Sequence, residues 1–210
     1  YRVGRDIKVR IHRDGSFSYN GIRTSYDNIF CPLAGRHQID NAAVALGLVE
    51  SLTHQGLSVG EDTVLKGIRE ARWEGRLEVI RTKPIVLLDG AHNAGGAAAL
   101  SHALAKEFSF RKLIFVFGVL QDKDYVSMLR RLLPLGKRLI LTRPNTERAM
   151  PPEAIVPLAQ EHIGEIEVVR DSRKAVERAL AVAGPDDLIC VTGSLYLVGE
   201  IKRSFSTGIS

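Results

Sequence analysis

Four groups of polar residues follow apolar runs in the second half of the chain. The groups are residues 89–93, 118–124, 142–149 and 192–200. If each apolar run is a buried strand, the groups gather at the carboxyl ends of a parallel sheet, where sheets of this kind bind ligands. Carboxylates, a histidine and hydroxyls at four strand ends therefore favour a pocket for a polar ligand.

Each of these residues also has a purely structural interpretation. Asp89 is typical of a turn aspartate that accepts backbone N–H groups, and His92 is typical of an ordinary loop histidine. Thr192, Gly193 and Ser194 suit the start of a helix, where a hydroxyl caps the first turn. Only the coincidence of four such strand ends favours a pocket, and the spacing does not name its ligand.

The glycines of these groups argue against three common sites. The segment DGAHNAGG lacks the order G-x-G-x-x-G, which disfavours a nicotinamide or flavin site. The segment TGSLY does not match G-x-S-x-G, so Ser194 is a poor hydrolase nucleophile. The chain also lacks the G-x-x-x-x-G-K-[ST] loop, so a cradle for the phosphates of ATP would lie elsewhere.

The composition is that of a folded protein without a membrane span. The chain has 210 residues, 45% of them hydrophobic, and a net charge of +5. No apolar run reaches the roughly 18 residues of a membrane helix, and the N-terminal segment does not resemble a signal peptide. The basic residues are spread along the chain, which argues against nucleic acid as a partner. We expect a soluble, cytoplasmic protein.

The two cysteines, Cys31 and Cys190, lie far apart in the sequence and each has apolar neighbours. Neither belongs to a CxxC motif or a Cys/His cluster. We therefore expect two buried thiols, with no disulfide and no metal site.

Residues 1–72 alternate in short segments before two helical stretches begin. The pairs Asp14-Gly15 and Asn20-Gly21 are strong turn signals, so the segments around them predict hairpin strands. One helix is predicted from Asp40 to the glycine at position 56, and another from Glu61. These few elements would leave apolar faces uncovered, which indicates the tail of a larger domain.

Residues 73–210 alternate between strands and helices. This order predicts an α/β domain of the Rossmann-like, doubly wound type, with a mostly parallel six-stranded sheet covered on both faces. The predicted strands are 77–81, 85–88, 113–118, 138–142, 167–169 and 188–192. The predicted helices between and after them are 97–108, 125–133, 152–162, 173–183 and 196–205.

Five ordered motifs resemble the folylpolyglutamate synthase and dihydrofolate synthase family, relatives of the Mur ligases. They are LAGRHQIDNAAVALGLVESL, ARWEGRLEVI, VLLDGAHNAGGAAAL, FVFGVLQDKDYVSML and ICVTGSLYLVGEI. The resemblance covers the C-terminal part of such an enzyme. It implies that residues 1–72 are the end of a central ATPase domain whose phosphate-binding loop and magnesium ligands precede this chain.

The resemblance also implies a reaction. An ATP-dependent ligase of this family uses ATP and Mg²⁺ to convert a carboxylate of dihydropteroate or folate into an acyl phosphate, which the amine of glutamate then attacks. The complete enzyme is expected to be a monomer, and the present chain to be inactive without the missing domain. The sequence does not say which pterin substrate is used or how many glutamates are added.

Residue roles follow from the family motifs position by position. Asn41 matches the amide that holds the adenine, with a helix cap as its alternative role. Arg76 matches an arginine that reaches the terminal phosphate, with an ion pair to Glu74 or Glu78 as its alternative. Asp89 matches the carboxylate that accepts from the ribose hydroxyls.

The remaining family positions concern the substrate. His92 and Asn93 are placed near the nucleotide and the incoming glutamate, with His92 as a catalytic candidate. Ser194 is placed as a substrate contact. The residues Asp122, Lys123 and Asp124 follow the family pattern without separate roles.

A rival interpretation belongs to a different class of protein. In it the chain is a free-standing, non-catalytic α/β domain that binds a nucleotide or an anionic metabolite. A phosphate-binding loop upstream in the same reading frame would exclude this interpretation.

Overall fold

The computed structural model describes residues 1–206, which form two compact units. The first unit spans Tyr1–Trp73 and the second begins at Glu74. The boundary predicted from the sequence lies one residue earlier. Throughout the described part, every helix is too short or too polar to serve as a membrane span.

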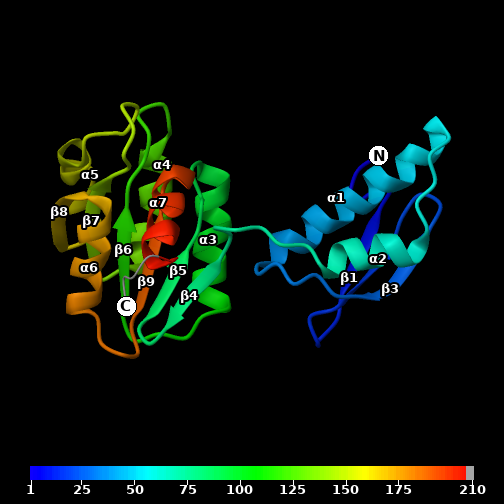
Figure 1. Ribbon diagram of the computed structural model, residues 1–210, viewed down its shortest axis with the longest axis horizontal. Helices are drawn as coiled ribbons and strands as arrows, with labels where there is room; N and C mark the ends of the chain where they lie inside the picture. Colours follow the sequence, from blue (N-terminus) through cyan, green and yellow to red (C-terminus); the bar gives the residue numbers. More distant parts are fainter. Residues whose placement is uncertain (207–210) are drawn as a thin grey trace. The chain divides into compact units, whose positions relative to one another are not determined.

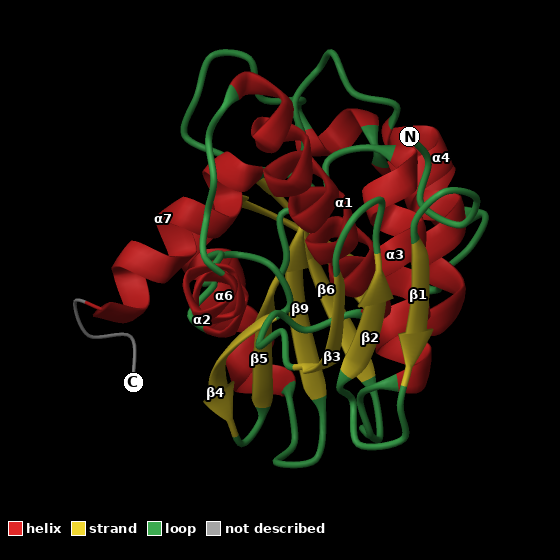
Figure 2. Ribbon diagram, turned by 90° about the vertical axis from the view of Figure 1, so that its right-hand side faces the viewer, coloured by secondary structure: helices red, strands yellow, loops and turns green. Residues whose placement is uncertain are grey.

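The first unit contains a three-stranded antiparallel sheet and two helices. Its strands β1 (Lys8–Ile11), β2 (Phe17–Asn20) and β3 (Ser25–Ile29) lie side by side in that order (Figure 2). They are followed by α1 (Arg36–Leu52), a 3₁₀ turn η1 (Thr53–Gln55) and α2 (Glu61–Arg69). Apolar side chains of all three strands pack against both helices.

Helix α1 begins earlier than the sequence indicated. Its first residue is Arg36, and Gly35 precedes it with a φ of 99°. Glycine adopts this backbone without a steric penalty, so the chain turns there and the helix starts four residues before Asp40. One face of the helix is buried, but Val44 and Leu48 on another face are 48% and 65% exposed.

The second unit contains a six-stranded sheet in the order β4-β5-β9-β6-β7-β8. All neighbouring strands are parallel except β4, which pairs with β5 in the antiparallel sense (Figure 1). This confirms the predicted mostly parallel sheet. The strands are β4 (Glu78–Thr82), β5 (Ile85–Leu88), β6 (Leu113–Phe117), β7 (Arg138–Arg143), β8 (Glu165–Asp171) and β9 (Leu188–Thr192).

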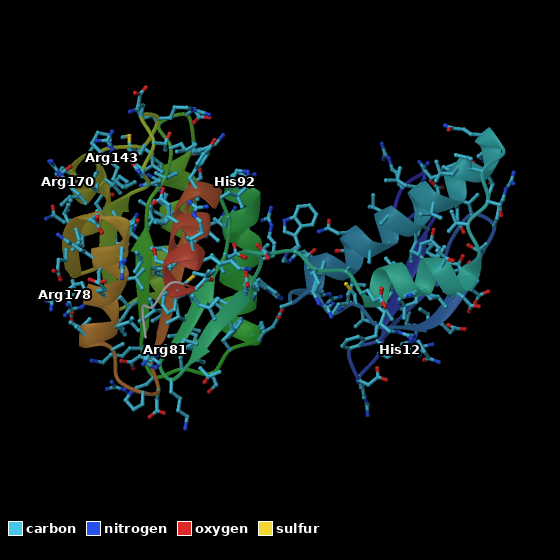
Figure 3. All side chains as sticks on the ribbon, in the orientation of Figure 1. His12, Arg81, His92, Arg143, Arg170 and Arg178 are labelled. Carbon is cyan, nitrogen blue, oxygen red and sulfur yellow. The ribbon has the colours of Figure 1, made fainter. Side chains whose placement is uncertain are left out.

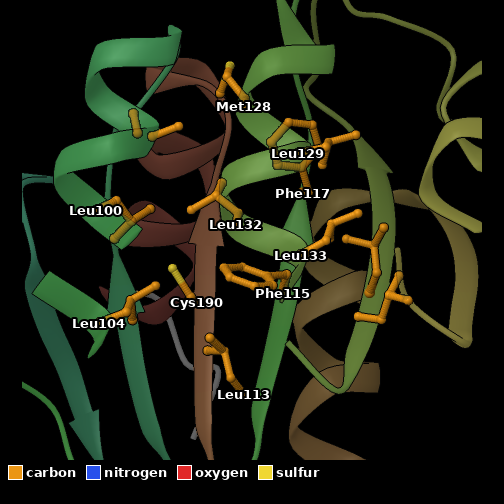
Figure 4. Packing of buried hydrophobic residues seen from close by; sticks show 14 of the residues in the cluster. Leu100, Leu104, Leu113, Phe115, Phe117, Met128, Leu129, Leu132, Leu133 and Cys190 are labelled. Carbon is orange, nitrogen blue, oxygen red and sulfur yellow. The ribbon is translucent and has the colours of Figure 1, made fainter. Parts of the chain in front are cut away.

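Helices cover both faces of this sheet because its strands are apolar on both sides. In β6, Leu113, Phe115 and Phe117 pack under α3 (Ala94–Lys106) and α4 (Tyr125–Leu132), as Figure 4 shows. The alternating residues Ile114 and Val116 face α6 (Ser172–Val182) and α7 (Leu195–Ser206). This is the doubly wound arrangement predicted from the sequence.

The predicted helix over residues 152–162 was wrong in its extent. The structure has a 3₁₀ turn, η3 (Pro152–Ala154), and then a short helix, α5 (Val156–Gln160). A continuous helix would place Pro157 in its interior, where proline has no N–H to donate and clashes with the preceding turn. The other 3₁₀ turn of this unit, η2 (Leu133–Leu135), follows α4 directly.

The two cysteines are free thiols in different surroundings. Cys190 lies on the central strand β9 and is fully buried, whereas Cys31 in the first unit is half-buried. Burial, with a smaller contribution from the nearby charge of Asp89, raises the pKa of the Cys190 thiol well above its usual value. Cys190 is therefore a core residue.

Candidate functional site

The loops that follow β5, β9 and β6 are joined by backbone hydrogen bonds. The N–H of Gly193 donates to the carbonyl oxygen of Ala91 (3.1 Å), and the N–H of Gly118 donates to that of Thr192 (3.2 Å). Gly193 has a φ of 106°, and a Cβ atom there would lie 2.6 Å from the carbonyl oxygen of Gly118. Only glycine fits at this position, and the two hydrogen bonds join the ends of the three strands.

Asp89 lies at the end of β5 and is only 5% exposed. Its Oδ2 accepts a hydrogen bond from the backbone N–H of Leu77 (3.0 Å), and its Oδ1 accepts one from that of Ala91 (2.9 Å). The turn role considered for this aspartate is therefore present in the structure. The carboxylate ties the start of the unit, residues 75–77, to the loop after β5.

Arg76 stands between two residues with left-handed backbone. Gly75 has a φ of 68° and Leu77 a φ of 45°. A leucine in this region costs about 1–3 kcal/mol and persists only where its surroundings impose it. Two hydrogen bonds impose it here, from the N–H of Gly90 to the carbonyl oxygen of Gly75 (2.7 Å) and from Leu77 to Asp89. The half-buried Arg76 is thus held on a fixed turn beside the strand ends.

The two acidic neighbours of Arg76 both form ion pairs with Lys202 of α7. The Nζ atom of Lys202 lies 3.1 Å from Glu74 and 2.7 Å from Glu78. Glu78 also accepts from the N–H of Gly75 (2.7 Å). Burial alone would raise the pKa of the Glu78 carboxyl, but the hydrogen bonds from Lys202 and Gly75 outweigh it and hold that pKa below its usual value. These bonds hold the Arg76 turn to helix α7 through Lys202.

His92 and Asn93 follow Asp89 in the same loop. The Nδ1 atom of His92 lies 2.8 Å from the carbonyl oxygen of Gly90, which can only accept, so Nδ1 carries the proton. In a neutral ring this leaves Nε2 as a proton acceptor. Asn93 is the N-cap of α3, where its Oδ1 accepts from the N–H of Gly96 (2.8 Å). Its exposed amide nitrogen remains a possible donor to a ligand.

Ser194 is 2% exposed at the start of α7. Its Oγ accepts from the backbone N–H of Tyr196 (3.1 Å), as a helix-capping hydroxyl does. The next two residues, Leu195 and Tyr196, are exposed. Ser194 therefore acts as a helix cap in this structure. Leu195 and Tyr196 expose more surface to a ligand than Ser194 does.

Asn41 lies in the first unit, in the second turn of α1. The helix-cap alternative for this residue is wrong, because the helix starts at Arg36 and its N-cap is Gly35. The amide nitrogen of Asn41 donates to Oε1 of Gln38 (3.0 Å). The side chain is exposed and its amide oxygen can accept a further hydrogen bond.

The loops after β6 and β7 are linked by charged side chains. Asp122 forms ion pairs with Lys123 (2.8 Å) and with Arg148 (3.1 Å). Lys123 and Arg148 help to hold the pKa of the Asp122 carboxyl below its usual value, with Lys123 the larger cause. Asp124 is the N-cap of α4 and accepts from the N–H of Ser127 (3.0 Å). Asp122 and Asp124 thus have distinct structural roles that the sequence did not assign.

Comparison with known proteins identifies the second unit. A family model described as "Mur ligase, glutamate ligase domain" matches residues 75–195, more than half of the chain. This chain belongs to the Mur ligase family. The expected resemblance is confirmed, and the matched range contains Arg76, Asp89, His92, Asn93 and Ser194.

Relatives of this Mur ligase chain are folate enzymes. It is 37% identical to the probable bifunctional folylpolyglutamate synthase/dihydropteroate synthase of Halobacterium salinarum, over 97% of this chain and 25% of that protein. It is 35% identical to the dihydrofolate synthase/folylpolyglutamate synthase of Mycobacterium tuberculosis, over 88% of this chain and 42% of that protein. The chain therefore spans a quarter to less than half of these relatives, and it matches their C-terminal part.

A solved structure supports the same relationship. The folylpolyglutamate synthase of Mycobacterium tuberculosis complexed with ADP superposes with a TM-score of 0.86 at 30% identity. The match covers 97% of this Mur ligase chain and 48% of that enzyme. The α/β architecture of the chain is thus that of the C-terminal half of a folylpolyglutamate synthase.

One feature of the Mur ligase chain escaped the sequence analysis. A hollow of about 940 Å³ opens between the ends of β7 and β8, the start of α6 and one side of α7. The loop 142–149 had been noted as polar, but three arginines meet here from three separate elements: Arg143, Arg170 and Arg203. Sequence spacing gives no signal for such a meeting. Within residues 1–206, no group of three or more His, Cys, Asp or Glu side chains is arranged to hold a metal ion.

Proposed function

We propose that this chain is the C-terminal part of an ATP-dependent ligase that joins glutamate to dihydropteroate or folate. The observation that carries the proposal is the turn of Arg76, which is strained, fixed by Asp89 and Lys202, and set beside the strand-end loops of a Mur ligase unit. Strain of this kind accumulates at functional sites. The names of the relatives supply the substrate class.

In this proposal Arg76 binds the outermost phosphate of ATP. Its guanidinium is always charged and presents a planar fork of donors, which suits a phosphate whose charge moves during transfer. Asn41 has an exposed amide that can hold the adenine edge. When ATP is bound, its terminal phosphoryl group activates the substrate carboxylate.

The strand-end residues serve the acceptor side of the reaction. His92 offers Nε2 as a proton acceptor for the glutamate amine, because Nδ1 is already committed to Gly90. Asn93 and the loop of Ser194 are proposed to bind the substrates. Asp89 is proposed to act chiefly by positioning Arg76, since both carboxylate oxygens already accept backbone N–H groups; its contact with the ribose stays a prediction.

The chain is proposed to need a preceding ATPase portion for activity. The exposed Val44 and Leu48 on α1 support this, because they leave an apolar face uncovered in the first unit. By the family resemblance, the magnesium ligands are assigned to that portion, and no step here runs through them. A monomeric enzyme and a cytoplasmic location stay predictions from the sequence.

The test compares this chain with a version extended at its N-terminus by the upstream reading frame. Glutamate ligation to dihydropteroate and to folate would be measured with ATP and magnesium. We expect turnover only from the extended protein. Turnover by the 210-residue chain alone, or none by an extended protein that binds ATP, would contradict the proposal.

A further inference from the structure

The arginine-lined hollow of the second unit lies apart from the residues assigned to the reaction. Arg143 ends β7 and Arg170 lies near the end of the neighbouring strand β8. Figure 3 shows both at the same end of the sheet as His92, whereas Arg178 lies at the other end. These arginines therefore lie at the ligand-binding edge on β7 and β8, whereas His92 and Ser194 follow β5 and β9.

Arg143 and Arg170 line the same hollow, and Arg170 has an acidic partner. Arg170 forms an ion pair of 2.7 Å with Glu153. The backbone N–H of Glu153 itself, then Arg170 and then Arg143, hold the pKa of the Glu153 carboxyl below its usual value. The ion pair with Glu153 uses only part of the donors of these two guanidinium groups, and a guanidinium matches carboxylate oxygens in a planar fork.

The acidic residues of the hollow shape it. Glu200 of α7 accepts from the N–H of Asn145 (2.7 Å) and from the hydroxyl of Ser172 (2.9 Å), so it joins the loop after β7 to the start of α6. Asp171 caps α6 by accepting from the N–H of Lys174 (2.8 Å). Three arginines and three acidic residues line the hollow, so its formal charge is zero. Such a lining suits alternating carboxylates and amide N–H groups better than a run of phosphates.

The hollow is large and leads toward the strand-end loops. Its volume of about 940 Å³ lies near the upper end of the range for small-molecule pockets, roughly 300–1,000 Å³, and exceeds the need of one amino acid. A second hollow of about 470 Å³ shares Asn145, Glu200 and Arg203 with it and reaches Leu195 and Tyr196. Tyr196 is 53% exposed, two residues after Ser194. Together the hollows form a path from that loop to the arginines.

We infer that this path binds the γ-linked glutamyl chain of a polyglutamylated substrate or product, with Arg143 and Arg170 holding its carboxylates. The inference rests on the proposed function for the identity of the chain. A γ-glutamyl chain carries one free carboxylate for each residue and an amide N–H at each link. The arginines supply donors for the free carboxylates, and the acidic residues of the hollow supply acceptors for the amide N–H groups.

The test measures binding to the 210-residue chain, without any turnover. Calorimetry and NMR titration would use γ-linked triglutamate, L-glutamate and inorganic pyrophosphate as probes. We expect saturable binding of triglutamate, weaker binding of glutamate, and little displacement by pyrophosphate. Arg143→Ala should weaken triglutamate binding about tenfold or more, since it removes a charge-assisted contact, and Arg143→Lys should weaken it less.

Arg178→Ala is the matched control, because Arg178 is also an ion-paired arginine beside β8 but lies at the opposite end of the sheet (Figure 3). Three results would overturn the inference: no saturable binding of triglutamate, equal loss in the Arg143 and Arg178 variants, or equal competition by pyrophosphate. If the chain binds triglutamate through Arg143 while the extended protein ligates no glutamate, the proposed function fails and the binding site stands.

Discussion

Asp89 Oδ2 accepts a hydrogen bond of 3.0 Å from the backbone N–H of Leu77, which lies twelve residues earlier in the chain. This bond connects the end of a buried strand to the turn that carries Arg76. The buried carboxylate of Asp89 thereby fixes the backbone from which the Arg76 side chain extends. The geometry of the Arg76 turn depends on Asp89 as well as on local contacts such as that between Gly75 and Glu78.

Asp89→Asn is expected to lower both stability and turnover. An asparagine amide offers one acceptor oxygen in place of two, so either Leu77 or Ala91 loses a buried partner at a cost of about 1–3 kcal/mol. Urea unfolding of the chain would measure the stability, and glutamate ligation by the extended enzyme the activity. Asp186→Asn, at an exposed position just before β9, is the control. Wild-type values for both quantities would contradict the positioning role.

Arg76→Ala is expected to cut turnover of the extended enzyme by about a hundredfold or more, as loss of a comparable electrostatic contact does. Arg76→Lys should restore little, because an ammonium lacks the planar fork. Steady-state kinetics with saturating ATP would measure the loss. Arg81→Ala, at the other end of the sheet (Figure 3), should remain near wild type. Normal turnover in Arg76→Ala would assign this arginine to the scaffold.

His92→Asn separates the two nitrogen atoms of the histidine. The asparagine amide can still donate to the carbonyl oxygen of Gly90, but nothing replaces Nε2. We expect unchanged unfolding free energy and a turnover about a hundredfold lower. His102→Asn on the exposed side of α3 is the control. Retained turnover with lowered stability would show that only the Nδ1 bond matters.

Gly193→Ala is expected to destabilise the second unit by at least about 1–3 kcal/mol, because alanine is strained at a positive φ. Its Cβ atom would also lie 2.6 Å from the carbonyl oxygen of Gly118. Gly164→Ala should have a small effect, since a Cβ atom there meets nothing within 4 Å. Thermal unfolding of both variants would check the difference. Equal melting temperatures would mean that the three loops can move apart.

Glu50 is expected to make the first unit less stable in acid. Burial would raise the pKa of its carboxyl. The hydrogen bonds from the hydroxyl and N–H of Thr24 and from the N–H of Ile22 outweigh burial, so the pKa lies below its usual value. Because the folded pKa lies below the unfolded value of about 4.3, the stabilisation is complete above that value and is lost as the pH falls through the folded pKa.

The measurement for Glu50 is urea unfolding of the chain between about pH 6 and about pH 3. Glu50→Gln should lower the stability near neutral pH and remove part of its decline in acid. Glu61→Gln, at an exposed position, is the control. An equally steep decline in wild type and Glu50→Gln would contradict the role of this carboxylate.

Hydrophobic periodicity predicted the large sheet well. Both faces of β6 are buried, so its run of five apolar residues is visible in the sequence as a continuous block. Strand β8 was predicted too short, as residues 167–169. Its ends carry Glu165 and Asp171, and it is extended by pairing with β7, which the local sequence does not reveal. Helix ends were displaced for a different reason, since Gly35 and Pro157 act through local backbone geometry.

The site was only partly visible in the sequence. The strand-end rule located Asp89, His92 and Asn93 on one loop, because they are consecutive. It did not reveal that Asp89 binds Leu77, nor that Glu74 and Glu78 pair with Lys202. Those contacts join residues that are distant in the sequence and that meet only in the folded second unit.

Each compact unit contains one cysteine, and the two thiols differ in their access to solvent. Cys190 becomes reactive only when the central strand of the large sheet separates from its helices. Cys31 responds to smaller openings of the first unit. A thiol reagent therefore yields two labelling rates that report separately on the two halves of the chain, without an added fluorophore or an engineered residue.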